Sequence, residues 1–235
     1  MSGTLFGIGV GPGDPDLITL KALKILERAK VVAYPAPENG ESLARSIAAP
    51  HIPAGLKEII IRTPMIPGNF PAHDVYDRYA YQIEICLSEG QDVALLCEGD
   101  PFLYGSFMYM FSRFSGRHSV EVVPGVSSLV ACAAAAGVPL VSRNQVLTVV
   151  PGPLDEEELE GRIKGAPAIA IMKVGRHLEK ICRILDRLDL LDNAHYVERA
   201  TMAEQRVMPL RRVKGDSAPY FSMVLIRQGE EEAGI

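Results

Sequence analysis

Apolar residues occur along this chain in short continuous runs, which alternate with longer segments where apolar residues recur at helical spacing. Residues 93–97, Val-Ala-Leu-Leu-Cys, form a run typical of a strand buried on both faces of a parallel sheet. Residues 17–29 instead have leucines at positions 17, 20, 23 and 26, the spacing of one helix face. This alternation predicts a parallel α/β domain in the first half of the chain.

The first half is predicted to contain four strands and four helices. We expect the strands at residues 4–10, 31–35, 58–62 and 93–97, and the helices at residues 17–29, 41–48, 72–88 and 105–114. Asp16 is the expected N-cap of the first helix, and Asp100 and Pro101 suit a helix start after the fourth strand. The Pro-rich residues 63–71 are expected to form a loop.

The second half is predicted to form a mixed sheet, because strands near its end follow one another without helices between them. The strands are expected at residues 119–123, 146–150, 168–172, 195–198, 207–213 and 220–227, and the helices at residues 155–164, 176–188 and from a Ser127 or Ser128 cap to residue 136. Residues 115–118 are polar and mark the expected boundary. We therefore predict two αβα domains, residues 1–114 and 119–228, followed by an acidic tail at residues 229–235.

Composition indicates a folded chain with no membrane segment. Of the 235 residues 48% are hydrophobic, which excludes intrinsic disorder, but no apolar run reaches the roughly 18–20 residues that span a bilayer. The N-terminus has no signal-peptide pattern. The four cysteines are isolated in apolar patterns, which is typical of buried thiols in a reducing cytoplasm, and the five histidines have no metal-ligand spacing. We expect a cytoplasmic protein without a metal site.

The distribution of charge differs between the two halves. Residues 1–113 contain nine Lys and Arg against thirteen Asp and Glu, whereas residues 173–227 contain eleven basic against seven acidic residues. The net charge of −5 makes nucleic acid a poor partner. The second half still has enough basic residues for a local surface that binds a small polyanion.

The glycine-rich first turn invites a dinucleotide-binding interpretation, but the details oppose it. Gly7, Gly9, Gly11 and Gly13 alternate rather than following the Gly-x-Gly-x-x-Gly spacing, and Pro12 lacks a backbone donor. The second strand ends in Tyr-Pro rather than in the acidic residue that binds a ribose, and no P-loop is present. A tight connection without any ligand remains the alternative for this turn.

Three strand-to-helix turns are notable together: Gly-Pro-Gly-Asp at residues 11–14, Gly-Asp-Pro at residues 99–101 and Pro-Gly-Val-Ser-Ser at residues 124–128. With Met-Lys-Val-Gly at residues 172–175 and Glu-Arg-Ala-Thr at residues 198–201, they resemble the tetrapyrrole methylase family over essentially the whole chain. The resemblance implies two αβα domains with the active site in a trough between them, a homodimer, and methyl transfer from S-adenosyl-L-methionine with S-adenosyl-L-homocysteine as product.

The resemblance also implies which residues contact the ligands. The cofactor-binding candidates carried over by motif are Pro12, Gly99, Asp100, Leu103, Tyr104, Ser127, Ser128, Met172 and Ala200. Ala200 stands where several relatives have glycine, so its methyl group narrows the space for the cofactor. The alternative for Leu103 and Met172 is core packing, and for Ser127 it is a helix cap.

The expected substrate is a reduced tetrapyrrole with many carboxylates, and these require cations. The substrate-binding candidates are Arg113, Arg143, Lys173, Arg176, Arg199 and Arg206. The alternative is a solvated helix face, since Lys180, Arg183 and Arg187 follow Arg176 at helical spacing. No catalytic side chain is assigned, because an electron-rich ring carbon attacks the sulfonium methyl group directly.

Within the family, the resemblance of residues 97–109, 172–177 and 218–223 points to methylation of carbon 20 of the metal-free substrate in cobalamin synthesis. The alternatives are the cobalt-bearing substrate, another tetrapyrrole carbon, and methylation of ribosomal RNA or a protein. Two readings from other classes are a nicotinamide-dependent oxidoreductase and a non-catalytic tetrapyrrole carrier or sensor. A test of S-adenosylhomocysteine binding distinguishes the methyltransferase from the carrier, because a carrier needs no pocket for this cofactor.

Overall fold

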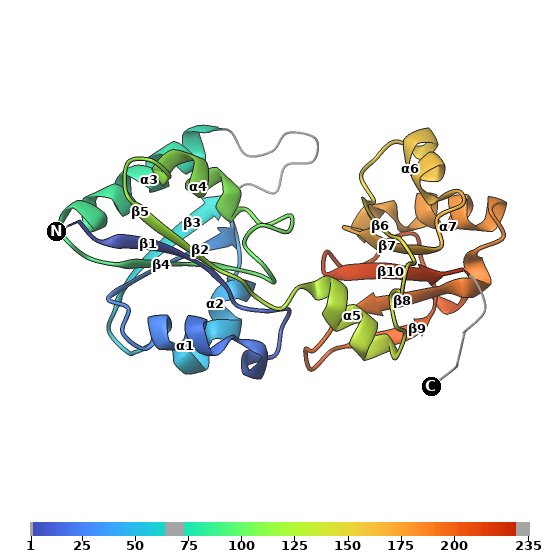
Figure 1. Ribbon diagram of the computed structural model, residues 1–235, viewed down its shortest axis with the longest axis horizontal. Helices are drawn as coiled ribbons and strands as arrows, with labels where there is room; N and C mark the ends of the chain where they lie inside the picture. The colour runs from blue at the N-terminus through green and yellow to red at the C-terminus, as the bar shows by residue number, and fades with distance from the viewer. Residues whose placement is uncertain (1, 64–72, 229–235) are drawn as a thin grey trace. The chain divides into compact units, whose positions relative to one another are not determined.

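The computed structural model describes residues 2–63 and 73–228 and divides into two compact units, Met1–Ser127 and Ser128–Ile235 (Figure 1). Each unit is a sheet with helices on both of its faces, as the sequence predicts. Most of the loop expected at residues 63–71, and the acidic tail expected at residues 229–235, lie outside the described residues.

The first unit contains a five-stranded sheet in the order β3-β2-β4-β1-β5, and every pairing in it is parallel. The strands are β1 (Thr4–Gly9), β2 (Val31–Pro37), β3 (Lys57–Thr63), β4 (Val93–Cys97) and β5 (Ser119–Val123). All five residues of β4 are buried, as expected for a strand covered on both faces. The parallel arrangement brings the carboxyl ends of β4, β1 and β5 to one edge, next to one another.

Helices cover the two faces of this sheet and enclose two apolar cores (Figure 1). The helices α3 (His73–Ser88) and α4 (Phe107–Phe114) pack on one face, and α1 (Leu20–Leu26) and α2 (Leu43–Ala48) on the other. The first helix begins later than predicted. A short 3-10 turn at Pro15–Leu17 comes first, and Thr19, not Asp16, caps α1, its hydroxyl accepting a hydrogen bond from the Ala22 N–H at 3.3 Å.

The predicted domain boundary at residues 115–118 is wrong. Strand β5 pairs with β1 in the first sheet, with Leu5 opposite Val120, so it does not begin the second domain. Residues 115–118 form a tight helix-to-strand connection in which the His118 N–H donates to the Phe114 carbonyl at 3.0 Å. Gly116 has φ +89° there, which explains the glycine that resembled a linker. The units separate between Ser127 and Ser128.

The second unit contains a mixed sheet in the order β6-β7-β10-β8-β9. Its strands are β6 (Leu147–Pro151), β7 (Ala168–Met172), β8 (Ala194–Glu198), β9 (Arg206–Pro209) and β10 (Ser222–Arg227). Strand β10 is antiparallel to both β7 and β8, so those two strands run in the same direction and end at the same edge. Strand β9 is shorter than predicted, because the chain turns at Leu210–Arg212.

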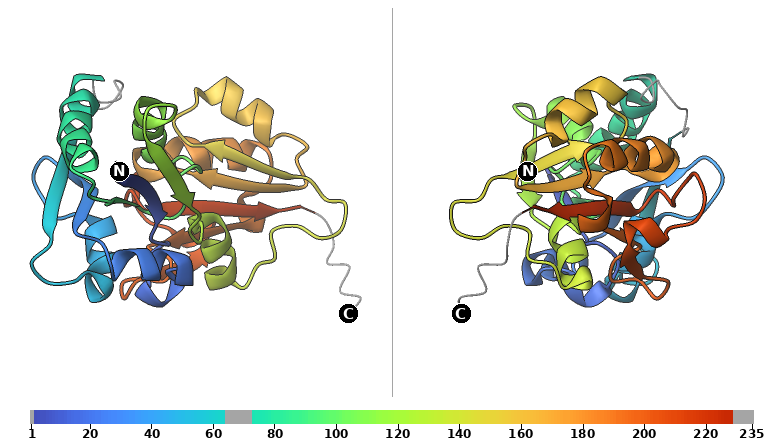
Figure 2. Two further views of the ribbon diagram at one scale, coloured as in Figure 1. Left: turned by 60° about the vertical axis from the view of Figure 1, so that its left-hand side comes forward. Right: turned by 90° about the vertical axis from the view of Figure 1, so that its right-hand side faces the viewer.

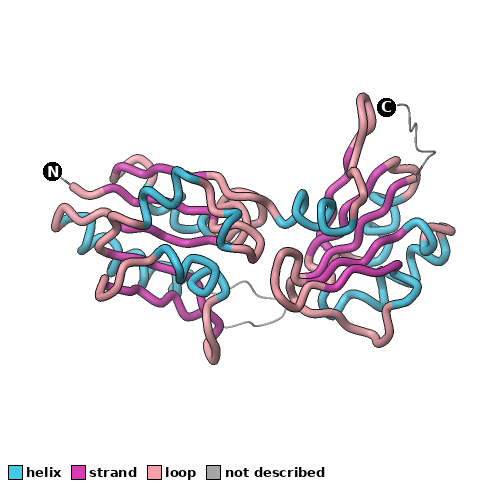
Figure 3. The backbone as a smooth tube through the Cα atoms, turned by 90° about the horizontal axis from the view of Figure 1, so that it is seen from below, coloured by secondary structure: helices cyan, strands magenta, loops and turns pink. Residues whose placement is uncertain are grey.

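Three helices cover the second sheet. The helix α5 (Ser128–Ala136) packs on one face, while α6 (Glu156–Ile163) and α7 (Leu178–Arg187) pack on the other (Figure 2). The strands of both sheets and the loops at their ends are distinguished by colour in Figure 3. Among the described residues, no helix is both long and apolar enough to cross a membrane.

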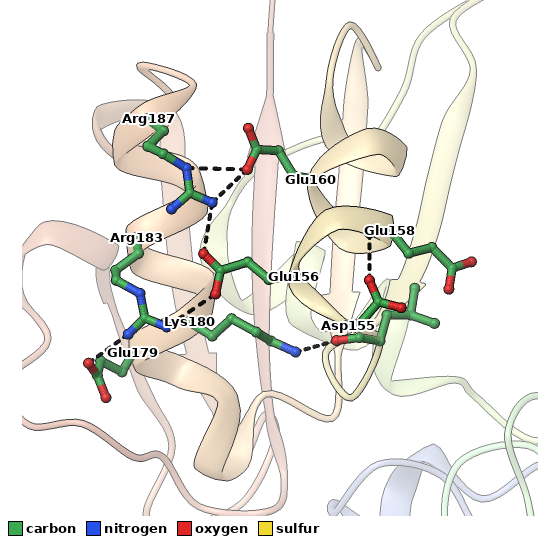
Figure 4. Close-up of polar contacts among 9 residues, drawn as sticks. Asp155, Glu156, Glu158, Glu160, Glu179, Lys180, Arg183 and Arg187 are labelled. Atoms are coloured by element: carbon green, nitrogen blue, oxygen red, sulfur yellow. Dashed lines mark hydrogen bonds and ion pairs between the residues drawn. The ribbon is translucent and has the colours of Figure 1, made fainter.

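Ion pairs between α6 and α7 account for several of the basic residues in the second half (Figure 4). The Arg187 guanidinium contacts Glu156 at 2.9 Å and Glu160 at 2.6 Å, and Arg183 contacts Glu156 at 3.3 Å and Glu179 at 2.6 Å. Each such surface pair contributes about 0–1 kcal/mol. Arg183 and Arg187 of α7 therefore belong to a solvated, ion-paired helix face, the alternative given for the basic residues of this helix.

Candidate functional site

Three turns meet at the carboxyl edge of the first sheet, where β4, β1 and β5 end side by side. The turns after β1 and β4 bond to each other through Gly11 and Gly99. The Gly99 N–H donates to the Gly11 carbonyl at 2.8 Å, and the Gly11 N–H donates back to the Gly99 carbonyl at 3.3 Å. The Gly-Pro-Gly-Asp and Gly-Asp-Pro motifs are therefore in direct backbone contact.

The turn after β5 approaches the same point closely enough to exclude any side chain. A Cβ atom built on Gly125 would lie 2.1 Å from the Gly99 carbonyl oxygen, and one on Gly9 would lie 2.6 Å from the Gly125 Cα. Gly99 itself has φ +62°, a conformation that other residues rarely adopt. Glycine at these positions is therefore required by packing.

Asp100 ties two of these turns together, and this differs from its predicted role as a helix cap. Its Oδ1 accepts a hydrogen bond from the Phe102 N–H at 2.9 Å, and its Oδ2 accepts one from the Gly125 N–H at 3.1 Å. The helix α4 begins only at Phe107. The Asp100 carboxylate therefore holds the loop of residues 100–105 against the turn after β5, and hydrogen bonds to a charged acceptor of this kind are the stronger ones.

The loop held by Asp100 presents aromatic surface to solvent. Phe102 is 49% exposed and Tyr104 is 42% exposed, whereas Leu103 is half-buried. The Phe102 ring packs edge-on against Phe111 at 5.1 Å between centroids, and Tyr104 has φ +56°. Strained backbone in an exposed loop is typical of functional sites. Pro12, in the neighbouring turn, is buried.

The second sheet has a corresponding edge, formed where β7 and β8 end and β9 begins. Lys173 follows β7 with φ +55°, and Arg199 and Thr201 follow β8 with φ +49° and +66°. Arg206 opens β9 directly opposite Glu198, and Arg176 lies in the exposed turn after β7. Four of the predicted substrate cations thus share this edge.

A buried carboxylate lies beneath these cations, and the sequence analysis did not single it out. Glu198 is 6% exposed, accepts a hydrogen bond from the Tyr196 hydroxyl at 2.6 Å and lies 3.6 Å from the Arg206 guanidinium. Burial and this hydrogen bond raise the pKa of Tyr196. The signal was available, because Tyr196 and Glu198 alternate along a strand and so point to the same face.

Met172 and Ala200 lie at this edge, but their side chains are buried. They are 9% and 6% exposed and pack in one apolar cluster with residues 131–133 of α5. The core-packing alternative for Met172 is therefore correct for its side chain. Their backbone groups remain the only part of either residue that is suited to a ligand contact. Ser127 and Ser128 stand at the start of α5, which begins at Ser128.

Arg113 and Arg143 are not brought to either edge. Arg113 lies in the last turn of α4, which runs back toward the start of β5, and its guanidinium contacts Asp77 at 2.7 Å and the Tyr109 carbonyl at 2.8 Å. Arg143 is exposed and precedes the start of β6. The prediction that Arg113 and Arg143 bind the substrate is therefore not supported by their positions in the structure.

Glu98, immediately before the Gly99 turn, was also missed by the sequence analysis. It is half-buried, and burial raises the pKa of its carboxyl, opposed by the backbone N–H groups of Glu98 and Ala44. Carboxyls with raised pKa are frequent at functional sites. The sequence signal was an acidic residue directly after five buried positions.

These two edges suit ligand binding better than covalent catalysis. Burial raises the pKa of the Cys97 thiol well above its ordinary value, which keeps it protonated and inert. Among the described residues, no group of three or more His, Cys, Asp or Glu is arranged to hold a metal ion. The first edge offers backbone groups and aromatic rings, and the second offers cations for an anionic ligand.

Comparison with known proteins identifies the chain's relatives. The family model "Tetrapyrrole (Corrin/Porphyrin) Methylases" matches residues 4–213. The chain is 41% identical to the cobalamin biosynthesis protein CobIJ of Mycobacterium bovis, over 98% of this chain but 47% of that protein, so it spans about half the length of that relative. It is 40% identical to precorrin-2 C(20)-methyltransferase of a Sinorhizobium species, over 95% of both chains. It is 30% identical to cobalt-precorrin-2 C(20)-methyltransferase of Salmonella typhimurium, over 99% and 100%.

Solved structures share the fold. Cobalt precorrin-4 methyltransferase superposes with a TM-score of 0.75 at 24% identity, covering 95% of this chain and 94% of the other. Uroporphyrin-III C-methyl transferase from Thermus thermophilus, solved as a complex with S-adenosyl homocysteine, superposes with a TM-score of 0.69 at 24% identity over 99% and 98%.

Because the three turns approach so closely, adding a single methyl group at Gly125 is expected to destabilise the protein. Gly125→Ala should lower the free energy of unfolding by about 3 kcal/mol or more, since the new Cβ must displace the Gly99 carbonyl. Gly161→Ala in α6 is the matched control, because its Cβ meets nothing within 4 Å; it should raise stability by about 0.5–1 kcal/mol. Urea unfolding of both variants measures the difference, and equal stability would contradict the contact.

The raised pKa of Glu98 predicts a pH-dependent effect on stability. Its protonated form is favoured in the folded state, so its contribution is complete below the ordinary pKa of 4.5 and is lost as pH rises through the raised value. The Glu98→Gln variant cannot ionise at this position and so does not lose this stability. The difference in unfolding free energy between the variant and the wild type should therefore increase in favour of the variant from about pH 4 to pH 8. The exposed Glu89 gives the control variant Glu89→Gln. A difference that does not change with pH would rule out the raised pKa.

Proposed function

Because the chain belongs to the tetrapyrrole (corrin/porphyrin) methylase family, we propose that it transfers a methyl group from S-adenosylmethionine to carbon 20 of precorrin-2, giving precorrin-3A in cobalamin biosynthesis. One observation carries the proposal: 40% identity to a precorrin-2 C(20)-methyltransferase over 95% of both chains. The turns of the first sheet, where we propose that the methyl donor binds, are packed closely enough to exclude a side chain at Gly9 and at Gly125.

The cofactor is proposed to bind at the turns of the first unit, with Pro12, Gly99, Asp100, Leu103, Tyr104 and Ser127 as contacts, and with Ser128, Met172 and Ala200 contributed by the second unit. The residues present fit this ligand. The exposed Phe102 and Tyr104, on the loop that Asp100 holds, supply aromatic surface for the adenine ring. A related methyltransferase has been solved with S-adenosyl homocysteine.

The chemistry requires positioning more than reactive side chains. S-adenosylmethionine would supply an electrophilic methyl group: the ring carbon would bond to it as the carbon–sulfur bond breaks, with that electron pair staying on sulfur. The methylated ring carbon would then lose its proton. The loop fixed by Asp100 orients the donor, and correct orientation of two reactants is worth on the order of 7–11 kcal/mol. Transfer also requires the donor and acceptor sites to face each other, which stays a prediction.

The substrate's carboxylates are proposed to bind the cations at the edge of the second sheet, namely Lys173, Arg176, Arg199 and Arg206. Arginine suits this role because its planar guanidinium binds a carboxylate through two hydrogen bonds. Arg206 lies 3.6 Å from the buried Glu198, and its side chain remains 62% exposed and so is accessible to a ligand.

A cobalt-bearing substrate is the second candidate. It is supported by the 30% identity to a cobalt-precorrin-2 C(20)-methyltransferase. It ranks second because the identity to the enzyme for the metal-free substrate is higher, at 40%. We further propose that the protein is cytoplasmic, in line with its free, mostly buried cysteines. The homodimer is proposed from the family resemblance alone.

Asp100 provides the sharpest test of the cofactor site. Asp100→Ala removes both acceptors that hold the loop, so affinity for S-adenosylhomocysteine should fall about tenfold or more. Asp92→Ala is the matched control, because Asp92 also accepts from a backbone N–H, that of Thr4 at 2.8 Å, but before β4 begins. Titration calorimetry measures both, and equal affinities would remove this loop from the site.

Activity is tested by incubating the protein with precorrin-2 and S-adenosylmethionine bearing a ¹³C-labelled methyl group. We expect one added methyl by mass and its signal at carbon 20 by NMR. A parallel reaction with the cobalt complex decides between the two substrates. Binding of S-adenosylhomocysteine without methylation of either substrate would contradict the proposed reaction, and absence of binding would contradict the whole assignment.

A further inference from the structure

Two aromatic rings are held at the surface of the second unit, just before β10. Tyr220 is 57% exposed and Phe221 is 38% exposed, and their rings meet edge to face at 5.0 Å and 89°. Large apolar side chains exposed together are uncommon away from binding surfaces. The sequence analysis placed these residues in a strand and in a stretch that carries the family resemblance, without assigning them a ligand contact.

The backbone around these rings is fixed to both turns of the second edge. The Ala218 N–H donates to the Gly175 carbonyl at 2.9 Å in the turn after β7, and the Arg199 N–H after β8 donates to the Phe221 carbonyl at 2.8 Å. The Ser222 hydroxyl also donates to the Pro219 carbonyl at 2.6 Å. The ring pair is therefore part of the same ordered edge as the predicted substrate cations.

Basic residues adjoin the ring pair on this edge. Arg199 is joined to Phe221 through the backbone, and Arg206 opens the strand beside β8. Lys173 and Arg176 belong to the turn after β7, which holds Ala218. Glu198, which lies 3.6 Å from the Arg206 guanidinium, is 6% exposed, whereas Glu204 and Asp216 are exposed in the neighbouring loops. The surface thus combines exposed aromatic rings with positive charge, which is complementary to a ring-shaped apolar ligand that carries carboxylates.

We propose that Tyr220 and Phe221 form a stacking surface for the ring face of an acidic tetrapyrrole whose carboxylates the neighbouring cations bind. The inference rests on the proposed function and adds to it a specific contact with the substrate. Aromatic side chains bind flat conjugated ligands through their faces and tolerate variation at the ligand's centre. The surface should therefore accept both metal-free and metal-bearing rings.

The test uses the double variant Tyr220→Ala/Phe221→Ala, with uroporphyrin as a stable, planar, carboxylate-rich probe. We expect its affinity for uroporphyrin, measured by fluorescence, to fall about tenfold and the KM for precorrin-2 to rise by a similar factor. The affinity for S-adenosylhomocysteine should stay within about twofold, since the rings lie outside the proposed cofactor contacts. Tyr220→Phe keeps the ring and should bind as the wild type does.

Two control variants distinguish the loss of these two rings from misfolding and from the loss of any exposed aromatic side chain. Tyr81→Ala, at the 67% exposed Tyr81 of α3, should change neither affinity. Tyr220→Leu/Phe221→Leu keeps apolar bulk without rings, and it should show the same loss as the alanine variant while melting like the wild type.

Three outcomes would overturn the inference. The first is an unchanged KM in the double variant, and the second is a wild type that does not bind uroporphyrin. The third is a change of oligomeric state by sedimentation with the KM retained, which would assign the rings to contact with a second copy. Each leaves binding of S-adenosylhomocysteine intact, whereas failure of the proposed function would abolish that binding in the wild type.

Discussion

Contact between backbones at the carboxyl edge of the first sheet is the constraint on which the site depends. Gly9, Gly99 and Gly125 approach so closely that a side chain on Gly9 or Gly125 would overlap a neighbouring strand's turn. Asp100 adds two hydrogen bonds across the same place. Because the turns interlock, the exposed loop beyond them is held in one conformation, and a ligand that binds it finds the loop already ordered.

The loops at the edge of the second sheet have a different kind of constraint. Lys173, Arg199 and Thr201 adopt left-handed backbone conformations although none of them is glycine. Such conformations cost of order 1–3 kcal/mol each, and surrounding structure must over-determine them. The hydrogen bond from the Arg199 N–H to the Phe221 carbonyl is part of that structure. The backbone at Arg199 is thus fixed by a contact with the residue before β10, while Arg206 on the same edge forms an ion pair with the buried Glu198 at 3.6 Å.

The elements with strong periodicity could be predicted from the sequence, because buried strands such as Val93–Cys97 and the helix α3 have a local signature. The domain boundary could not, since residues 115–118 look the same in a linker and in a tight turn, and only the pairing of β5 with β1 distinguishes them. The position of Asp100 was found through its motif, but its bond to Gly125 joins residues 25 apart, which local patterns do not encode. The predicted roles of the site residues await the experiments above.

Strand β10 lies in the middle of the second sheet, between β7 and β8, although it comes last in sequence among the strands of the described residues. During synthesis the first unit has all five of its strands once residue 123 has emerged, whereas β6–β7 and β8–β9 stay separate pairs until residues 222–227 are made. The second unit must therefore assemble late and through distant contacts, a slow route that leaves unpaired strand edges exposed to other chains. Nascent molecules are most vulnerable to aggregation in that interval.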